Sequence, residues 1–158
     1  MELNKIMDEL KSLGTERTKK MYIKNGAKEP VFGVSISAMK PIFKKIKFNQ
    51  FLAQQLYSTG NYDAMYLAGM IAEPKKMTEE DFNRWIEGAY FYMISDYIVA
   101  VTLAETDIAF TVSDRWINSG EELTMSAGWS CYNWLLGTLK DSEFDKDRLL
   151  AMLYTVRD

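Results

Sequence analysis

The residues best suited to chemistry lie in one segment, AYFYMISDYIVA, residues 89–100. Three aromatic side chains, Tyr90, Phe91 and Tyr92, precede a single acid, Asp96, in otherwise uncharged surroundings. The chain contains no histidine, so it lacks the usual general base and the commonest transition-metal ligand. Any catalysis must therefore use carboxylates, tyrosines, lysines or arginines. Asp96 and Tyr92 are the candidate catalytic residues.

Helix geometry decides whether these two residues can act together. They are four residues apart, so they share one face if the helix reaches back to Tyr92. That face would point to a groove or solvent, because it lies nearly opposite an apolar stripe made of Ile94, Tyr97, Ile98 and Val101. The alternative is an ordinary helix start. Ser95 would then cap the helix, the helix dipole would favour Asp96 in the first turn, and Tyr92 would lie outside the helix.

The elements that must position this segment are helices, and no stretch reads convincingly as a strand. Apolar residues recur at i, i+3, i+4 and i+7, which is typical of one helix face. Two examples are Ala64, Leu67, Ala68 and Ile71, and then Leu149, Met152, Leu153 and Val156. About ten short helices, paired about every 30 to 35 residues, predict an all-α fold. We expect an α-solenoid of degenerate helical hairpins, with residues 1–158 as a single domain. A compact irregular all-α domain is the alternative.

Capping residues predict where several helices begin. Ser35 or Ser37 can cap one helix, with Pro41 in about its first turn, where a missing N–H costs little. Thr78 with Asp81 resembles a capping box, in which the two residues exchange side-chain to backbone hydrogen bonds.

Composition limits the class of protein. The chain has 158 residues and is 47% apolar, which is ample for a core. Its one cysteine excludes a disulfide framework and a Cys-rich zinc site. The start carries no signal peptide, and no run approaches the roughly 20 apolar residues that span a bilayer. We therefore expect a cytoplasmic protein with no membrane contact.

Positive charge is concentrated in the first third of the chain. Residues 1–50 contain 11 Lys/Arg and 5 Asp/Glu, although the whole chain has a net charge of −3. Two pairs of lysines are one helical turn apart, Lys20 with Lys24 and Lys40 with Lys44, and Lys45 follows. These five lysines are candidate contacts for phosphate or another polyanion. The alternative is that they form solvated helix faces.

Tryptophans supply the remaining candidates. Trp129 lies away from a predicted apolar seam of Leu123, Ala127, Cys131 and Trp134. It is a candidate aromatic side chain of a binding groove of the protein, and packing against a neighbouring repeat is the alternative. Trp85 and Trp116 are expected in the core, and Cys131 is expected to be a buried small residue.

Three blocks resemble the DNA alkylation repair family, the bacterial alkylpurine glycosylases built from HEAT-like repeats. The blocks are FGVSISAMKPIFKKIK, STGNYDAMYLAGMIAEPKKMTEEDFNRWIEGAYFYMISDY and WINSGEELTMSAGW, and the resemblance covers roughly residues 4–157. It implies a curved array of helical pairs whose concave basic surface holds duplex DNA, damaged or branched. Active members hydrolyse the glycosidic bond of cationic alkylated purines with neither metal nor cofactor. A carboxylate stabilises the positive, sugar-like transition state.

The resemblance also assigns individual residues. The family's catalytic segment has a tryptophan followed four residues later by an aspartate, and Tyr92 and Asp96 stand at those places. In the block GEELTMSAGW the active pattern carries one or two arginines, whereas this chain has Met125 and Ser126. The family array also continues for one or two repeats past residue 158, so we expect the chain to lack C-terminal repeats.

Together these observations predict a diverged family member that binds duplex DNA non-specifically through a concave basic surface, with little or no glycosylase activity. Two alternatives stay open. One is a metal-independent DNA glycosylase that uses Asp96 with Tyr92. The other is an α-solenoid scaffold for a protein partner, since fold does not determine function.

Overall fold

The computed structural model of the chain describes residues 2–138, 147, 150 and 151. Every regular element in these residues is helical, as predicted. The elements are α1 (Leu3–Leu13), α2 (Glu16–Lys24), α3 (Ile36–Ile46), α4 (Gln50–Ser58), α5 (Tyr62–Ile71), η1 (Pro74–Lys76), α6 (Glu79–Gly88), α7 (Tyr92–Ile94), η2 (Ser95–Val99), α8 (Ala100–Ala104), α9 (Ala109–Ile117) and α10 (Glu122–Thr138). The predicted stripe of Leu149, Met152, Leu153 and Val156 lies outside the described residues.

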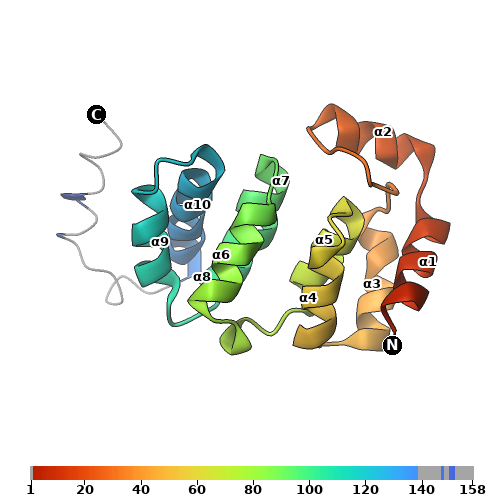
Figure 1. The fold of residues 1–158 in the computed structure, drawn as a ribbon, viewed down its shortest axis with the longest axis horizontal. Coiled ribbons are helices and arrows are strands. Elements are labelled where there is room, and N and C mark those ends of the chain that lie inside the picture. The colour runs from red at the N-terminus through yellow and green to blue at the C-terminus, as the bar shows by residue number, and fades with distance from the viewer. Residues whose placement is uncertain (1, 139–146, 148–149, 152–158) are drawn as a thin grey trace.

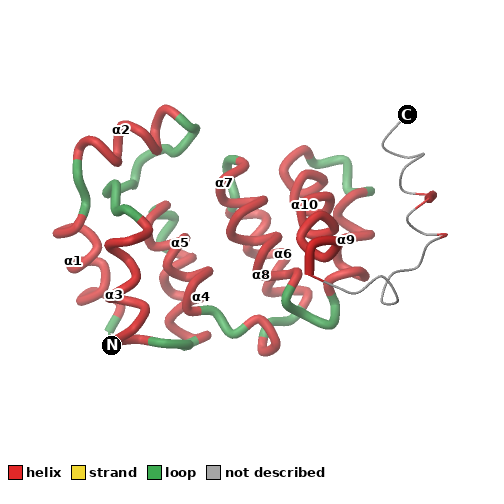
Figure 2. The backbone as a smooth tube through the Cα atoms, turned by 180° about the vertical axis from the view of Figure 1, so that it is seen from behind, coloured by secondary structure: helices red, strands yellow, loops and turns green. Residues whose placement is uncertain are grey.

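The helices form two layers that run along the long axis of the molecule (Figure 1). One layer holds α1, α4, α6 and α9, and the other holds α3, α5, the α7–α8 segment and α10, which Figure 2 shows from behind. Neighbours in sequence pack together, as α4 does with α5 and α9 with α10. Only α2 departs from this order, because it lies across one end of the row (Figure 1). Paired, sequential packing is the arrangement expected of a helical repeat fold.

Buried apolar side chains connect successive pairs into one cluster that runs from Ile6 in α1 to Leu135 in α10. The predicted α5 stripe is confirmed, since its four members are each 0% exposed: Ala64, Leu67, Ala68 and Ile71. Trp85, Trp116 and Cys131 are buried, also as predicted. None of the helices in the described ranges combines the length and the apolar character that a bilayer span requires.

Local capping accounts for several helix starts. The Ser35 hydroxyl accepts a hydrogen bond from the Ala38 N–H and begins α3. Thr78 and Asp81 form the predicted capping box of α6. The predicted place of Pro41 is wrong, because it lies inside α3 rather than in the first turn. Proline has no N–H, so it leaves the carbonyl four residues earlier without its helical donor.

Asp63 in α5 fixes the loop that leads into α3. Its carboxylate is 0% exposed and accepts the N–H groups of Phe32, Gly33 and Val34 at N···O distances of 2.5, 3.2 and 2.7 Å. Gly33 has φ +84, and a Cβ there would lie 2.4 Å from the Lys19 nitrogen, so the loop requires glycine. A buried carboxylate needs such donors. Through them, Asp63 holds the loop between α2 and α3 against α5.

Candidate DNA-binding surface and the Asp96 site

Asp96 lies in a helix that begins earlier than a Ser95 cap would allow. The segments α7, η2 and α8 follow one another without a break, and Tyr92 is the first helical residue. Ser95 is therefore inside the helix, and the alternative in which it caps the helix is wrong. Because the helix reaches back to Tyr92, the side chains of Tyr92 and Asp96 lie about one turn apart.

The middle of this helix, η2, is π-helical. A π turn contains one more residue than an α turn, so the residues beyond it shift around the helix axis. Ile94 and Ile98 are buried as predicted, but Tyr97 is 56% exposed and Val99 is buried at 0%. The predicted stripe is therefore wrong at Tyr97. In this position Tyr97 lines a small cavity of about 140 Å³ with Tyr66 and other residues of α5 and α8.

Two serine hydroxyls are the hydrogen-bond partners of Asp96, which is partly buried beside α10. Ser126 Oγ lies 2.8 and 3.0 Å from the two carboxylate oxygens, and Ser95 Oγ lies 3.1 Å from one of them. Ser126 belongs to the block in which the active family pattern has arginine. The position does face Asp96, yet it supplies a neutral hydroxyl. Among the described residues, Asp96 forms no ion pair.

Tyr92 is held by a second acid. Its side chain is 47% exposed, and its hydroxyl donates to the carboxylate of Glu122 at the start of α10. This hydrogen bond raises the pKa of Tyr92, and desolvation and the negative charges of Glu122 and Asp96 add to the effect. The Asp96 site therefore concentrates negative charge, which can stabilise a cation but repels phosphate. No three His, Cys, Asp or Glu side chains in the described part of the chain are grouped to hold a metal ion.

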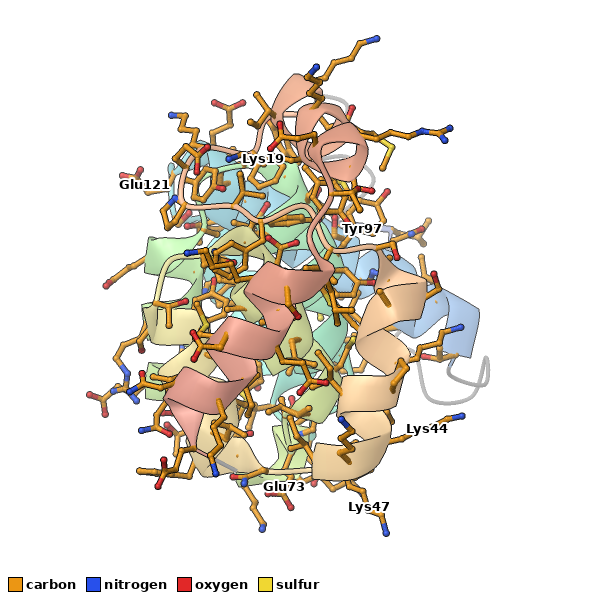
Figure 3. All side chains as sticks on the ribbon, turned by 90° about the vertical axis from the view of Figure 1, so that its right-hand side faces the viewer. Lys19, Lys44, Lys47, Glu73, Tyr97 and Glu121 are labelled. Atoms are coloured by element: carbon orange, nitrogen blue, oxygen red, sulfur yellow. The ribbon has the colours of Figure 1, made fainter. Side chains whose placement is uncertain are left out.

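The lysines of α2 and α3 differ in what they contact. Lys20, Lys24, Lys40 and Lys44 are exposed and form no ion pair with any described acid. Lys45 instead pairs with Glu9 of α1, with Nζ 3.1 Å from Oε1. Figure 3 shows Lys44 extending outward on the α3 side of the molecule, the side on which Tyr97 also lies. Four of the five predicted lysines thus have no acidic partner in the part of the chain that the structure describes, and their contact with phosphate stays a prediction.

The predicted seam of α10 is only partly correct. Ala127 and Cys131 are buried, but Trp134 is 38% exposed, while Gly128, Tyr132 and Leu135 are buried in its place. The predicted seam stepped by three residues from Cys131 to Trp134, whereas the buried face keeps the four-residue step from Cys131 to Leu135. It also includes Gly128 and Tyr132, since α10 packs against both α9 and α8. Trp129 is partly buried, and its ring centroid lies 6.4 Å from that of Tyr132.

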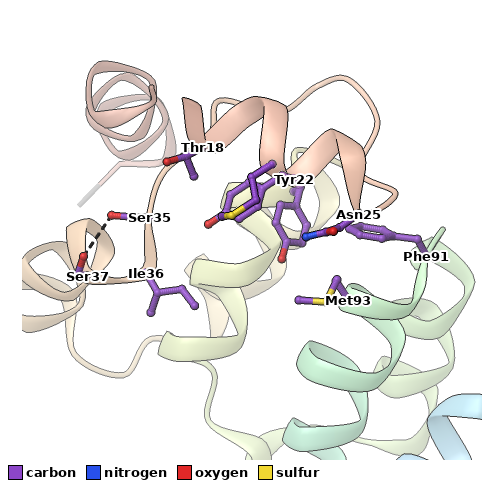
Figure 4. Close-up of a pocket in the computed structure, with 10 residues that line it drawn as sticks. Thr18, Tyr22, Asn25, Ser35, Ile36, Ser37, Phe91 and Met93 are labelled. Atoms are coloured by element: carbon purple, nitrogen blue, oxygen red, sulfur yellow. Dashed lines mark hydrogen bonds between the residues drawn. The ribbon is translucent and has the colours of Figure 1, made fainter. Parts of the chain in front are cut away.

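A cavity of about 440 Å³ lies beneath α2, between the starts of α3, α5 and α7 (Figure 4). Its walls consist of Thr18, Met21, Tyr22, Asn25, Ser35, Ile36, Ser37, Tyr62, Phe91 and Met93. This cavity could not be predicted from the sequence, because its walls come from four elements and no local spacing connects them. The only sequence signal for Phe91 and Met93 is that they are adjacent to Tyr92.

Comparison with known proteins gives three relationships. Residues 6–155 match the family described as DNA alkylation repair enzyme. An uncharacterized protein of Listeria innocua serovar 6a is 27% identical over 140 residues, which are 85% of this chain and 62% of that protein. An uncharacterized protein of Listeria monocytogenes serovar 1/2a is 28% identical over 152 residues, or 93% and 68% of the two chains. The chain thus spans about two thirds of the length of these relatives.

A solved structure is more similar still. It belongs to a new family of proteins related to the HEAT-like repeat DNA glycosylases, with affinity for branched DNA structures. It is 64% identical to this chain, with a TM-score of 0.97, and the match covers 100% of this chain and 67% of the other.

Proposed function

This chain belongs to the DNA alkylation repair enzyme family, and we propose that it binds branched DNA through phosphate contacts and does not release alkylated bases. Family membership and the HEAT-like fold agree with the resemblance found in the sequence. The observation that carries the proposal is the likeness, along the whole chain, to a protein with affinity for branched DNA structures.

The free lysines of α2 and α3 support the phosphate contacts. Lysine ammonium groups that pair with no acid can replace the counterions condensed on DNA, and this gives affinity without sequence preference. The two helices run in different directions, because α2 crosses the end of the row that contains α3 (Figure 1). Lysines on two such helices suit a ligand whose duplex arms also diverge.

The Asp96 site supports binding without base removal. Asp96 could stabilise a developing oxocarbenium ion, since an anion near that charge lowers its energy. Catalysis also requires the DNA backbone to approach closely. Asp96 and Glu122 repel phosphate, and Ser126 offers no positive charge to offset them. We therefore assign Asp96 and Tyr92 to a site that lacks the cation needed for turnover.

Fluorescence anisotropy with a labelled four-way junction and a linear duplex of matched length tests the proposal. We expect tighter binding to the junction, and affinity that falls steeply as salt rises. The Lys40→Ala/Lys44→Ala variant should bind both DNAs more weakly. Its slope of log affinity against log salt should be shallower by about 2, because each phosphate contact contributes roughly 0.9.

The matched control removes the same charge from the other layer. Lys5 and Lys11 on α1 are also exposed, so Lys5→Ala/Lys11→Ala changes net charge equally. This control should leave affinity nearly unchanged. An equal loss of DNA affinity in both variants would mean that net charge, and not the position of Lys40 and Lys44, determines binding. Binding that does not depend on salt, or no preference for the junction, would contradict the proposed function.

A further inference from the structure

We propose that the cavity beneath α2 receives one unpaired nucleotide of branched DNA. The inference rests on the proposed function, because it names the feature of branched DNA that the protein would recognise. The cavity measures about 440 Å³, which is within the range of sites that enclose small ligands. Figure 4 shows its walls contributed by α2 above, by the start of α3 on one side and by Phe91 and Met93 on the other.

Aromatic rings in fixed positions form the inner wall. The ring centroid of Tyr62 lies 5.0 Å from that of Tyr22, at an interplanar angle of 78°, and 5.3 Å from that of Phe91. The Tyr22 hydroxyl donates to the Val34 carbonyl at 2.7 Å, which fixes the ring. Aromatic faces and edges bind nucleobases of any sequence by stacking. The wall therefore suits the flat part of a nucleotide.

The mouth of the cavity is polar on one side and adaptable on the other. Asn25 carries an amide that both donates and accepts hydrogen bonds, as the edge of a base does. Ser37 is exposed, with its hydroxyl 3.2 Å from that of Ser35 (Figure 4). Met21 and Met93 have flexible thioether chains that can adjust to different bases. This combination favours a ring with a polar edge over a purely apolar ligand.

Positive charge beside the cavity favours a ligand whose aromatic ring belongs to an anion. Lys24 ends α2 directly before Asn25, and Lys40 lies one turn beyond Ile36 in α3. Both lysines are exposed and form no ion pair with described acids. A nucleotide within a DNA strand places a base between two phosphates. The cavity with flanking lysines has the complementary arrangement.

Two four-way junctions test the inference, one fully paired and one with a single unpaired 2-aminopurine at the branch point. We expect about tenfold tighter binding of the unpaired junction, from the stacking of one base on aromatic rings. Stacking should also quench the 2-aminopurine emission. Equal affinities with unchanged emission would overturn the inference while leaving the proposed function intact. If neither junction binds, both fail together. If the protein quenches free 2-aminopurine deoxynucleoside monophosphate as strongly as it quenches the unpaired junction, the cavity does not recognise branched DNA and the inference is overturned.

A pair of variants on α2 links the effect to the cavity. Met21 lines the cavity and is 52% exposed, whereas Ile23 lies outside it and is 45% exposed. Both positions tolerate a polar side chain, so folding should be retained. Met21→Glu places a carboxylate at the mouth and should abolish the tenfold preference for the unpaired junction. Ile23→Glu should weaken the binding of both junctions equally and keep the preference for the unpaired junction. Loss of the preference in both variants, or in neither, would overturn the assignment.

Discussion

Ser126 of α10 donates its hydroxyl to Asp96 of η2, with Oγ 2.8 and 3.0 Å from the two carboxylate oxygens. An arginine in this block would bring a positive charge and five N–H donors, whereas serine brings one donor and no charge. The serine orients the acid without neutralising it. The Asp96 site therefore keeps its negative charge, which repels phosphate.

Ser126→Ala should destabilise the protein by about 1 kcal/mol, because a partly buried carboxylate loses a hydrogen bond to a neutral donor. Urea denaturation measures the change. Ser130→Ala is the matched control, since Ser130 lies one turn further along α10 and is also partly buried. Equal stability of the two variants would mean that the Ser126–Asp96 contact contributes nothing to folding.

Base release should be absent in the wild-type protein. With protein in excess over methylated duplex DNA, we expect chromatography to detect no more free alkylpurine than in a blank. Tyr92→Trp/Ser126→Arg supplies the residue types of the active pattern, and its guanidinium can balance Asp96 and contact phosphate. That variant should release more base than the wild type, and adding Asp96→Asn should abolish the gain. Wild-type release that Asp96→Asn abolishes would instead establish the chain as a glycosylase.

Two glycines of α10 should respond oppositely to alanine. A Cβ at Gly128 would lie 2.8 Å from Ile117 Cγ2 and 3.1 Å from the Ser113 carbonyl oxygen, whereas one at Gly137 would meet nothing within 4 Å. Gly128→Ala should therefore destabilise by about 1–3 kcal/mol through overpacking. Gly137→Ala should stabilise by up to about 1 kcal/mol, because alanine favours helix. Thermal denaturation followed by circular dichroism gives both values. A destabilised Gly137→Ala would refute the open environment assigned to that position.

Stability should fall at alkaline pH partly because of Cys131. Burial raises the pKa of its thiol to about 11, against about 8.5 in an unfolded chain. The folded state therefore keeps the proton longer, so its advantage is complete below about pH 8.5 and is lost as pH rises towards 11. Between pH 8 and 10.5, the free energy of unfolding should fall by about 2 kcal/mol more in wild type than in Cys131→Ala. Urea titrations at the two pH values compare the proteins, and identical pH dependence would exclude this contribution.

Patterns that depend on near neighbours could be predicted from the sequence. The buried stripe of α5 and the capping box of Thr78 with Asp81 involve residues within two turns of each other, so they form wherever the helix forms. Tyr97 does not follow such a pattern. An α-helical period places its side chain toward the core, whereas the π-helical segment changes which side chains face the core.

An all-α fold, several helix starts, the family resemblance and the interest of Asp96 and the basic first third could all be predicted from sequence. The partners of these residues depend on the tertiary structure. Ser126 meets Asp96 across 30 positions, and Glu9 engages Lys45 across 36. The cavity beneath α2 combines four elements. Such contacts depend on how closely whole helices approach one another. The distance between two helices depends on side-chain volume, as at Gly128 against Ile117. The hydrophobic period of a single helix does not predict that distance.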